Sequence, residues 1–398
     1  MDSLFENIKL EIVALVVLLV GFVTTFLIVP KLIAIIRHTN LMDQADERSS
    51  HTVKTPTMGG ISFYISLIFG LFTIHFFGYD GSSLYVIVGL TILFFVGLKD
   101  DIMVLSAFTK LMAQLLAVSF VLILPDLWIT SFSGFLGIGD IPLYIGILIS
   151  YFLMIFIINA YNLIDGIDGL AGLLGLLIFT IFGFLFYLAG NYFYFLLCIL
   201  SIGFLAAFLR FNLSKKNKIF MGDTGSLVVG FLIAIMTIHF LAMPDQMYEQ
   251  IFLNPIHKFI IALSIIFFPT ADVSRVILMR LLNKRGPFSP DRCHMHHILV
   301  DRGLSHKKAS ITLAICGAII FTIIYLFNMA VSAWGLLAIF VLLYLMTFSI
   351  LLLLDYDDKA TTYRQRFKAM FSRDIQVLEF RIRKKIIFIL KRLFYRDM

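Results

Sequence analysis

Long apolar segments follow one another through most of this chain, and each is about long enough to cross a lipid bilayer. A membrane-spanning helix needs about 20 mostly apolar residues. Hydrophobic residues make up 60% of the 398 residues and charged residues only 14%, a composition far too apolar for a soluble domain. The segments lie near residues 11–36, 58–78, 83–98, 107–124, 142–161, 170–189, 191–209, 225–243, 257–282, 310–328 and 330–354.

The sequence therefore predicts an all-α, polytopic integral membrane protein with about eleven transmembrane helices. The boundary between the sixth and seventh helices depends only on Gly190 and Asn191. We expect the first segment to remain in the protein, because it is longer than a signal-peptide core and no small-residue cleavage site follows it. The three cysteines are scattered and form no CxxC pair, so we expect neither a disulfide framework nor a cysteine zinc site.

Basic residues are confined to every second connection between these segments. The connections at 77–82, 125–141, 190, 244–256 and near Asn328 contain no lysine or arginine. The alternate connections contain Arg37, Arg48, Lys54, Lys99, Arg210, Lys215, Lys216, Lys218, Arg280, Lys284, Arg285, Arg292, Arg302, Lys307 and Lys308. Connections rich in lysine and arginine stay in the cytoplasm. We therefore expect a cytoplasmic (inner) membrane protein with its N-terminus outside and its C-terminus inside.

The polar motifs lie on the same, cytoplasmic side. They occupy residues 43–60, 99–101, 159–172, 210–226 and 287–297. Charges that only mark helix ends would be shared between both faces of the membrane. The one-sided distribution predicts a cytoplasmic active site whose substrate or product is held in the membrane.

Four oxygen-bearing side chains recur every three residues at the end of the fifth segment: Asn159, Asn162, Asp165 and Asp168. On a helix or helical turn this spacing places them near one face. Carboxylate and amide oxygens suit Mg²⁺, which also retains water and substrate phosphate ligands. The alternative is a polar loop that merely breaks the helix.

The motif MGDTGS (221–226) opens the eighth segment. Thr224 is best explained as an N-cap, whereas Asp223 can both cap the helix and bind a metal ion. A helix N-terminus also offers backbone N–H groups to a phosphate. The pair Asp100–Asp101 ends the third segment, where it is either a water-facing helix end or part of a site.

The loop PFSPDRCHMHH (287–297) contains three histidines: His294, His296 and His297. A zinc site and a solvated loop are two interpretations. We favour a third, in which the histidines donate to a phosphate or sugar and Arg292 grips oxyanions.

Two lysines near the membrane surface also have ordinary explanations. Lys110 lies one turn before Gln114. The lysine side chain either extends to the membrane–water interface or holds a lipid phosphate. Lys54, before Pro56, is either a site residue or a solvated surface lysine.

In combination and order, these motifs resemble the polyprenyl-phosphate N-acetylhexosamine-1-phosphate transferase family, over about Asp43 to His306. The residues that carry the resemblance are DERSSH…TPTMGG, the DD pair with Lys110 and Gln114, NAYNLIDGIDGLAG, FN…MGDTGS and PFSPDRCHMHH. The resemblance implies an enzyme that transfers a sugar-1-phosphate from a UDP-N-acetylhexosamine to undecaprenyl phosphate. It also implies release of UMP and a requirement for Mg²⁺, for which Mn²⁺ can substitute.

The resemblance also assigns roles to individual residues. Asn162 and Asp223 match the metal-binding positions, and Asp100 and Asp101 match an acidic pair assigned to catalysis. The expected substrate-binding residues are Lys54, Lys110, Asn159, Asp165, Asp168, Asn212, Arg292, His294, His296 and His297. The histidine loop favours simple UDP-N-acetylhexosamines, although TPTMGG is also similar to the muramoyl-pentapeptide branch. The hexosamine and the glycan pathway stay open.

A membrane transporter is the alternative from another class, and Asp272 within the ninth segment is the acid that supports it. Arg275, one turn later, could pair with Asp272 structurally. The nearly charge-free spans and the absence of a visible internal repeat favour the enzyme. We expect no nucleic acid partner, and a homodimer stays open.

Residues 359–398 differ from the membrane domain, which we place at 1–358. They carry twelve lysines and arginines against three acids, and from Ile375 the apolar residues follow helical spacing. This pattern predicts a basic amphipathic helix on an anionic lipid surface. The alternative is a disordered basic tail.

Overall fold

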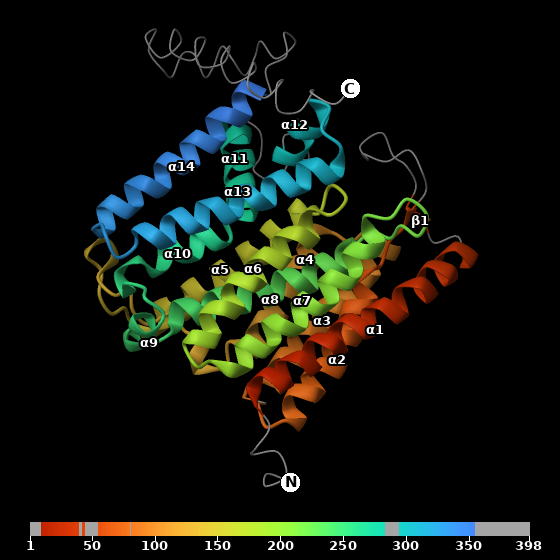
Figure 1. Ribbon diagram of the computed structural model, residues 1–398, viewed down its shortest axis with the longest axis horizontal. Coiled ribbons are helices and arrows are strands. Elements are labelled where there is room, and N and C mark those ends of the chain that lie inside the picture. The colour runs from red at the N-terminus through yellow and green to blue at the C-terminus, as the bar shows by residue number, and fades with distance from the viewer. Residues whose placement is uncertain (1–8, 40–41, 44–54, 80, 283–293, 355–398) are drawn as a thin grey trace.

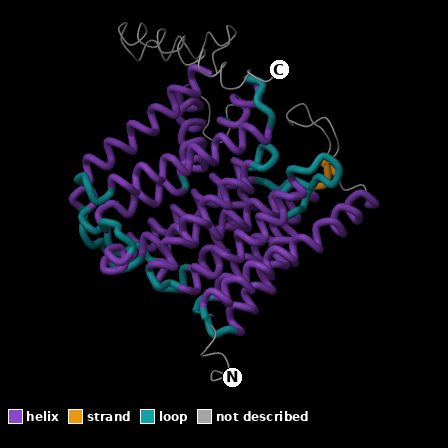
Figure 2. The backbone as a smooth tube through the Cα atoms, in the orientation of Figure 1, coloured by secondary structure: helices purple, strands orange, loops and turns teal. Residues whose placement is uncertain are grey.

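The computed structural model describes residues 9–39, 42–43, 55–79, 81–282 and 294–354. Lys54, Arg292 and the basic C-terminal segment lie outside the described residues, so those predictions stay predictions. In the described part nearly all residues belong to helices joined by short loops (Figure 2). The exception is a two-stranded ribbon, β1 (Met42–Asp43) with β2 (Thr55–Pro56), paired antiparallel.

The chain order of the helices follows the predicted apolar segments. The first seven are α1 (Leu10–Thr39), α2 (Gly60–Phe76), α3 (Ser83–Ile102), α4 (Ala107–Val121), α5 (Leu143–Ile164), α6 (Leu170–Leu188) and α7 (Tyr192–Asn212). The rest are α8 (Gly222–Ala242), α9 (Asp245–Gln250), α10 (Lys258–Ile265), α11 (Phe267–Leu282), α12 (Met295–Asp301), α13 (His306–Phe327) and α14 (Ala333–Leu354). The separation of α6 from α7 at residues 189–191 confirms the predicted boundary.

Within the described residues, eight helices are long and apolar enough to cross a membrane. The pair α10 and α11 adds a ninth span if it is counted as one, and α2 and α4 are shorter apolar helices. The all-α, polytopic fold is therefore confirmed, and about eleven spans are reached only if the bent pair and the two short helices are included.

The predicted ninth segment, 257–282, is not one straight helix. α10 and α11 meet at a bend of 76°. Pro269 lies in the first turn of α11, where its missing N–H and its ring are incompatible with a regular helix continuing from Ile265. The bend matters because it sets the direction of α11, which reaches the histidine loop.

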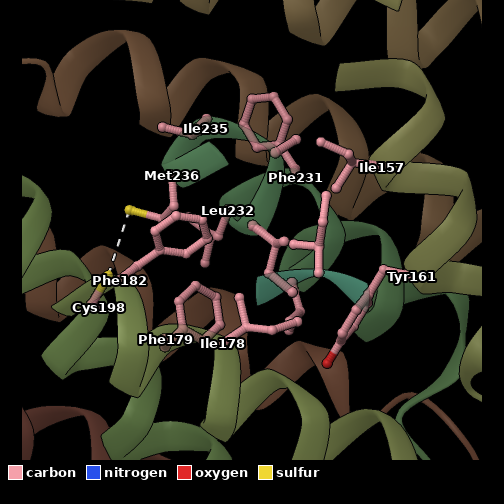
Figure 3. Close-up of a cluster of buried hydrophobic side chains, with 14 of the residues drawn as sticks. Ile157, Tyr161, Ile178, Phe179, Phe182, Cys198, Phe231, Leu232, Ile235 and Met236 are labelled. Carbon is pink, nitrogen blue, oxygen red and sulfur yellow. Dashed lines mark hydrogen bonds between the residues drawn. The ribbon is translucent and has the colours of Figure 1, made fainter. Parts of the chain in front are cut away.

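Helix α8 forms the centre of the bundle, and its side chains are buried along almost its whole length. Helices α2, α3 and α5 pack around it. Figure 3 shows the buried layer between α5, α6, α7 and α8, where Tyr161, Phe179, Phe182 and Phe231 interlock. The apolar side chains on α1 and α14 are largely exposed, as expected of surfaces that face lipid.

The two ends of the bundle differ in their connections. In Figure 1, α12 and the β1–β2 ribbon lie toward the upper and right sides, and α9 lies at the lower left. Most of the predicted polar motifs are therefore gathered at the end that contains α12 and β1, where α3, α5 and α11 also terminate.

Candidate active site

The N-terminus of α8 is held by the carboxylate of Asp101. Asp101 Oδ1 accepts from the N–H of Asp223 at 2.8 Å, and Oδ2 accepts from the N–H and hydroxyl of Thr224 at 3.0 and 2.5 Å. The prediction that Thr224 is the N-cap is wrong: Thr224 lies inside the first turn, and Met221 at the N-cap position provides no side-chain cap. Asp101 therefore acts as a cap supplied by α3.

Glycines allow the backbones to approach closely enough for this cap. A Cβ at Gly97 would lie 2.6 Å from Thr224 Cα and 2.8 Å from the Asp223 carbonyl oxygen. Gly222 has φ of +71° and leaves no room beside the Asp101 carboxylate. Since Gly60 of α2 likewise touches the backbone of Gly225, α2, α3 and α8 fix one another at this end.

Asp223 points toward the other polar groups of the site. Its Oδ1 accepts from Asn162 Nδ2 at 2.5 Å, and its Oδ2 lies 3.2 Å from Lys110 Nζ. Lys110 also forms an ion pair with Asp100, whose Oδ1 accepts from the Leu105 N–H at 2.6 Å. One lysine from α4 thus bridges carboxylates from α3 and α8, and an amide from α5 completes the group.

Asp165, at the end of α5, adds a further carboxylate. Burial raises its pKa to about 7, and repulsion from Asp223, Asp101 and Asp168 contributes to the rise. Lys110 is the one cation among the described residues that forms an ion pair with Asp100 or Asp223. Within the described part of the chain, the site therefore holds more carboxylates than cations to pair with them.

The four side chains spaced by three residues do not act alike. Asn162 bonds Asp223 and also Ser226 Oγ at 2.7 Å. Asn159 instead forms a reciprocal pair with Gln114, at 2.8 and 3.2 Å. Gln114 and Asn159 thus join α4 to α5.

Asp168 is engaged by basic groups of the chain itself. Its Oδ2 lies 2.7 Å from Lys218 Nζ and 3.1 Å from His306 Nδ1. Burial opposes its ionisation, but hydrogen bonds from His306 and Lys218 outweigh burial and lower the pKa. These contacts join α13 and the 213–221 loop to the 165–169 loop.

Asn212 is also committed to the backbone. Its Oδ1 accepts from the Gly169 N–H at 2.6 Å, and its Nδ2 donates to the Ile219 carbonyl at 2.8 Å. Gly169 has φ of +82°, so the chain turns sharply into α6 at this point. Asn212 therefore supports the 165–169 loop, and both of its amide atoms are already used.

His294 and Met295, at the described end of the histidine loop, are anchored to α11. His294 Nδ1 lies 2.7 Å from Asp272 Oδ2, and the Met295 N–H donates to Asp272 Oδ1 at 2.7 Å. His296 is buried against Gly166, and burial lowers its pKa to about 3. Among the described residues, no group of three His, Cys, Asp or Glu side chains is arranged to hold a metal ion, so the zinc interpretation gains no support.

The structure thus brings Asp100, Asp101, Lys110, Asn162 and Asp223 together directly. Asp168, Asn212 and His294 support the loops around them. The other predicted site residues that the structure describes are Asn159, Asp165, His296 and His297; Asn159 pairs with Gln114, and His296 lies against Gly166. Ser226, Lys218 and His306 are contacts that the sequence analysis did not identify. Ser226 stands in the MGDTGS motif and could have been noticed there, whereas Lys218 and His306 carry no signal beyond ordinary basic residues.

The regions that match known proteins include the residues of this site. The model of the family described as glycosyl transferase family 4 matches residues 83–241, from α3 to α8. Relatives named undecaprenyl-phosphate N-acetylglucosaminyl 1-phosphate transferase include the following three, one of them named as probable. The protein of Escherichia coli O157:H7 is 27% identical over 82% of this chain and 87% of its own length. The Yersinia pestis protein is 29% identical over 82% and 87%. The probable transferase of Bacillus subtilis is 28% identical over 84% and 89%.

These matches extend across the residues that build the site, and they agree with the family that the motifs resemble. The family model over residues 83–241 and the relatives over about four fifths of the chain support its assignment to the polyprenyl-phosphate N-acetylhexosamine-1-phosphate transferase family.

Proposed function

We propose that the protein transfers an N-acetylhexosamine-1-phosphate from a UDP-sugar to undecaprenyl phosphate and releases UMP. N-acetylglucosamine is the sugar in the names of its relatives. The observation that carries the proposal is the group formed by Asp100, Lys110, Asn162 and Asp223, drawn from four helix ends on one side of the bundle. Such a product would begin a lipid-linked cell-envelope glycan.

The residues at this group fit a divalent cation. Asp223 and Asn162 supply oxygen donors and lie close enough to share one ion, and the excess of carboxylates beside Asp165 favours a cation. Mg²⁺ needs only one or two protein carboxylates. When bound, Mg²⁺ or Mn²⁺ would neutralise charge on the diphosphate and on departing UMP. Asn162 would then have to present its oxygen, because its nitrogen now donates to Asp223.

The reaction itself needs alignment more than proton removal. An oxygen of the lipid phosphate would form a bond to the sugar-linked phosphorus, and the bond from that phosphorus to the UMP oxygen would break. A phosphate monoester is largely dianionic at neutral pH, because its second pKa is near 6. A general base is therefore of secondary importance, as in other phosphoryl transfers.

Lys110 and the acidic pair then have separable tasks. Lys110, fixed between Asp100 and Asp223, would hold the acceptor phosphate near the donor. Asp100 would orient Lys110, and Asp101 would keep the N-terminus of α8 in place through its cap. This division assigns Asp101 a positioning role in place of direct participation in the reaction.

The membrane and orientation are part of the same proposal. The basic residues in alternate connections support a site on the cytoplasmic side of the inner membrane, with the N-terminus outside. A nucleotide sugar made in the cytoplasm would then reach the site directly. The acceptor would enter from the bilayer.

Purified protein incubated with undecaprenyl phosphate and a panel of labelled UDP-sugars, with and without Mg²⁺, tests the proposal. We expect label in the lipid fraction from a UDP-N-acetylhexosamine only when Mg²⁺ or Mn²⁺ is present. Labelling from UDP-muramoyl-pentapeptide alone would instead assign the protein to the muramoyl-pentapeptide branch. The absence of lipid labelling from every donor would reject the proposal.

A further inference from the structure

Asp272 is a buried acid in the middle of α11, and its two oxygens are both occupied. Only 2% of the surface of Asp272 is exposed. Oδ2 contacts His294 Nδ1, and Oδ1 accepts the Met295 N–H, each at 2.7 Å. Both partners begin α12, so one carboxylate joins α11 to the histidine loop.

An ion pair with Arg275 does not explain this arrangement. Arg275 Nη2 lies 3.9 Å from Asp272 Oδ1, beyond hydrogen-bonding distance. Its Nε and one terminal nitrogen have no hydrogen-bond partner among the described residues. A carboxylate at membrane depth is costly and usually functional. The short contacts of Asp272 go to the loop, which removes the support that this acid offered for transport.

The contact determines which nitrogen of His294 carries a proton. A carboxylate only accepts hydrogen bonds, so Nδ1 of His294 must be the donor. Nε2 is then left for another partner, and the orientation of the ring is fixed. In metal sites and in catalytic triads, a carboxylate on one nitrogen of a histidine fixes the tautomer and orientation that the other nitrogen uses.

The same anchor controls the position of His296. Both ring nitrogens of His296 are buried without a hydrogen-bond partner among the described residues. Its ring lies against Gly166, where an added Cβ would collide with Nε2. The ring centroids of His294 and His296 are 5.6 Å apart. Fixing His294 and Met295 therefore presses His296 onto the loop that contains Asp165.

We propose that Asp272 is a positioning residue for sugar-phosphate transfer: it holds His294 with its proton on Nδ1 and sets α12 against the 165–169 loop. The inference rests on the proposed function. It extends that function to a residue in the middle of a bent span, outside all of the polar motifs. Asp272 acts through His294 and needs no contact with substrate.

Asp272→Asn tests the inference with little change in volume. If the Asn oxygen keeps the Met295 N–H, its NH₂ group faces His294 Nδ1, which must then accept and move the proton to Nε2. We expect kcat/KM to fall about 10- to 100-fold, as for other residues that orient a functional histidine. The matched control is Asp126→Asn, a carboxylate held by Tyr194 at 2.5 Å and near His239 at 3.6 Å, which should leave kcat/KM within about 2-fold.

Nitrogen-15 NMR of protein labelled at histidine measures the tautomer without an assay of turnover. His294, assigned through His294→Ala, should show a protonated Nδ1 in the parent and a protonated Nε2 in Asp272→Asn. In the His294→Ala background, Asp272→Asn should cost no further activity. An unchanged tautomer, or the same loss in both backgrounds, would overturn the inference. A parent that shows the expected tautomer but transfers no hexosamine phosphate would reject the proposed function alone.

Discussion

Asp165 is a buried carboxylate that lies near three other carboxylates of the site, those of Asp223, Asp101 and Asp168. Its pKa of about 7 means that the folded protein binds a proton more tightly than the unfolded chain does. In metal-free protein the free energy of unfolding therefore falls as the pH rises from about 4 to about 7, and it stays lower above that range. Burial is the main cause of this loss, and the repulsion from neighbouring carboxylates that adds to it reflects negative charge that would attract a divalent cation.

Asp165→Asn should remove that repulsion. We expect the metal-free variant to melt roughly 2 °C higher than the parent at pH 8, with a smaller difference at pH 5. Activity should fall, because the residue lies beside the metal-binding pair. Thermal unfolding in detergent with a chelator, at both pH values, measures the difference. An equal gain at pH 5 and pH 8 would mean that charge is not the cause.

Asp223→Asn separates metal binding from helix capping. The cap of α8 uses the backbone N–H of residue 223, which the substitution leaves intact, so the protein should remain folded. We expect kcat to fall at least 100-fold at ordinary Mg²⁺, since an amide lacks the charge of the carboxylate. Gel filtration and kinetics over a Mg²⁺ series measure both effects. Normal turnover would reduce Asp223 to a structural residue.

For single residues, the sequence indicated which side chains gather near the site better than it indicated what each of them contacts. Oxygen donors at three-residue spacing suggested one shared face, yet Asn159 pairs with Gln114 and Asp168 with Lys218 and His306. Partners far along the chain decide those contacts, and periodicity carries no information about them. Asn162 and Asp223 do lie together, because the end of α5 packs against the start of α8.

Among the secondary-structure elements, the close packing of α3 on α8 holds the site together. A Cβ at residue 97 would press on backbone atoms of Asp223 and Thr224, which cannot rotate away as a side chain could. Gly97→Ala should therefore separate the helices, weaken the Asp101 cap and lower kcat about 10-fold or more. Gly139→Ala is the control, because no atom lies within 4 Å of its Cβ. Similar kinetics for both variants would show that the packing tolerates the change.

The helices themselves were largely predictable, since apolar length determines a span. The bend between α10 and α11 was missed, although Pro269 gave a local signal for it. Its consequence, the reach of α11 to His294, depends on packing between segments that are distant in sequence. The anchor at Asp272 could not be found without that packing.

For the whole molecule, the distribution of basic residues predicts a site that faces the cytoplasm. We expect Asn217→Cys, in an exposed loop near Lys218, to react with a membrane-impermeant maleimide only after spheroplasts are opened. Gly139→Cys, at the other end of the bundle, should react in intact spheroplasts. The parent protein measures the background from its native cysteines. The reverse pattern would invert the proposed orientation.

The central claim is that a phosphate moves together with the sugar. The most direct test supplies purified protein with undecaprenyl phosphate, Mg²⁺ and UDP-N-acetylglucosamine that carries ³²P in the sugar-linked phosphate and ³H in the sugar. We predict that both labels enter the lipid in equal amounts and that UMP is the released nucleotide, with no transfer by Asp223→Asn. Entry of ³H alone, with ³²P left in UDP, would contradict sugar-1-phosphate transfer.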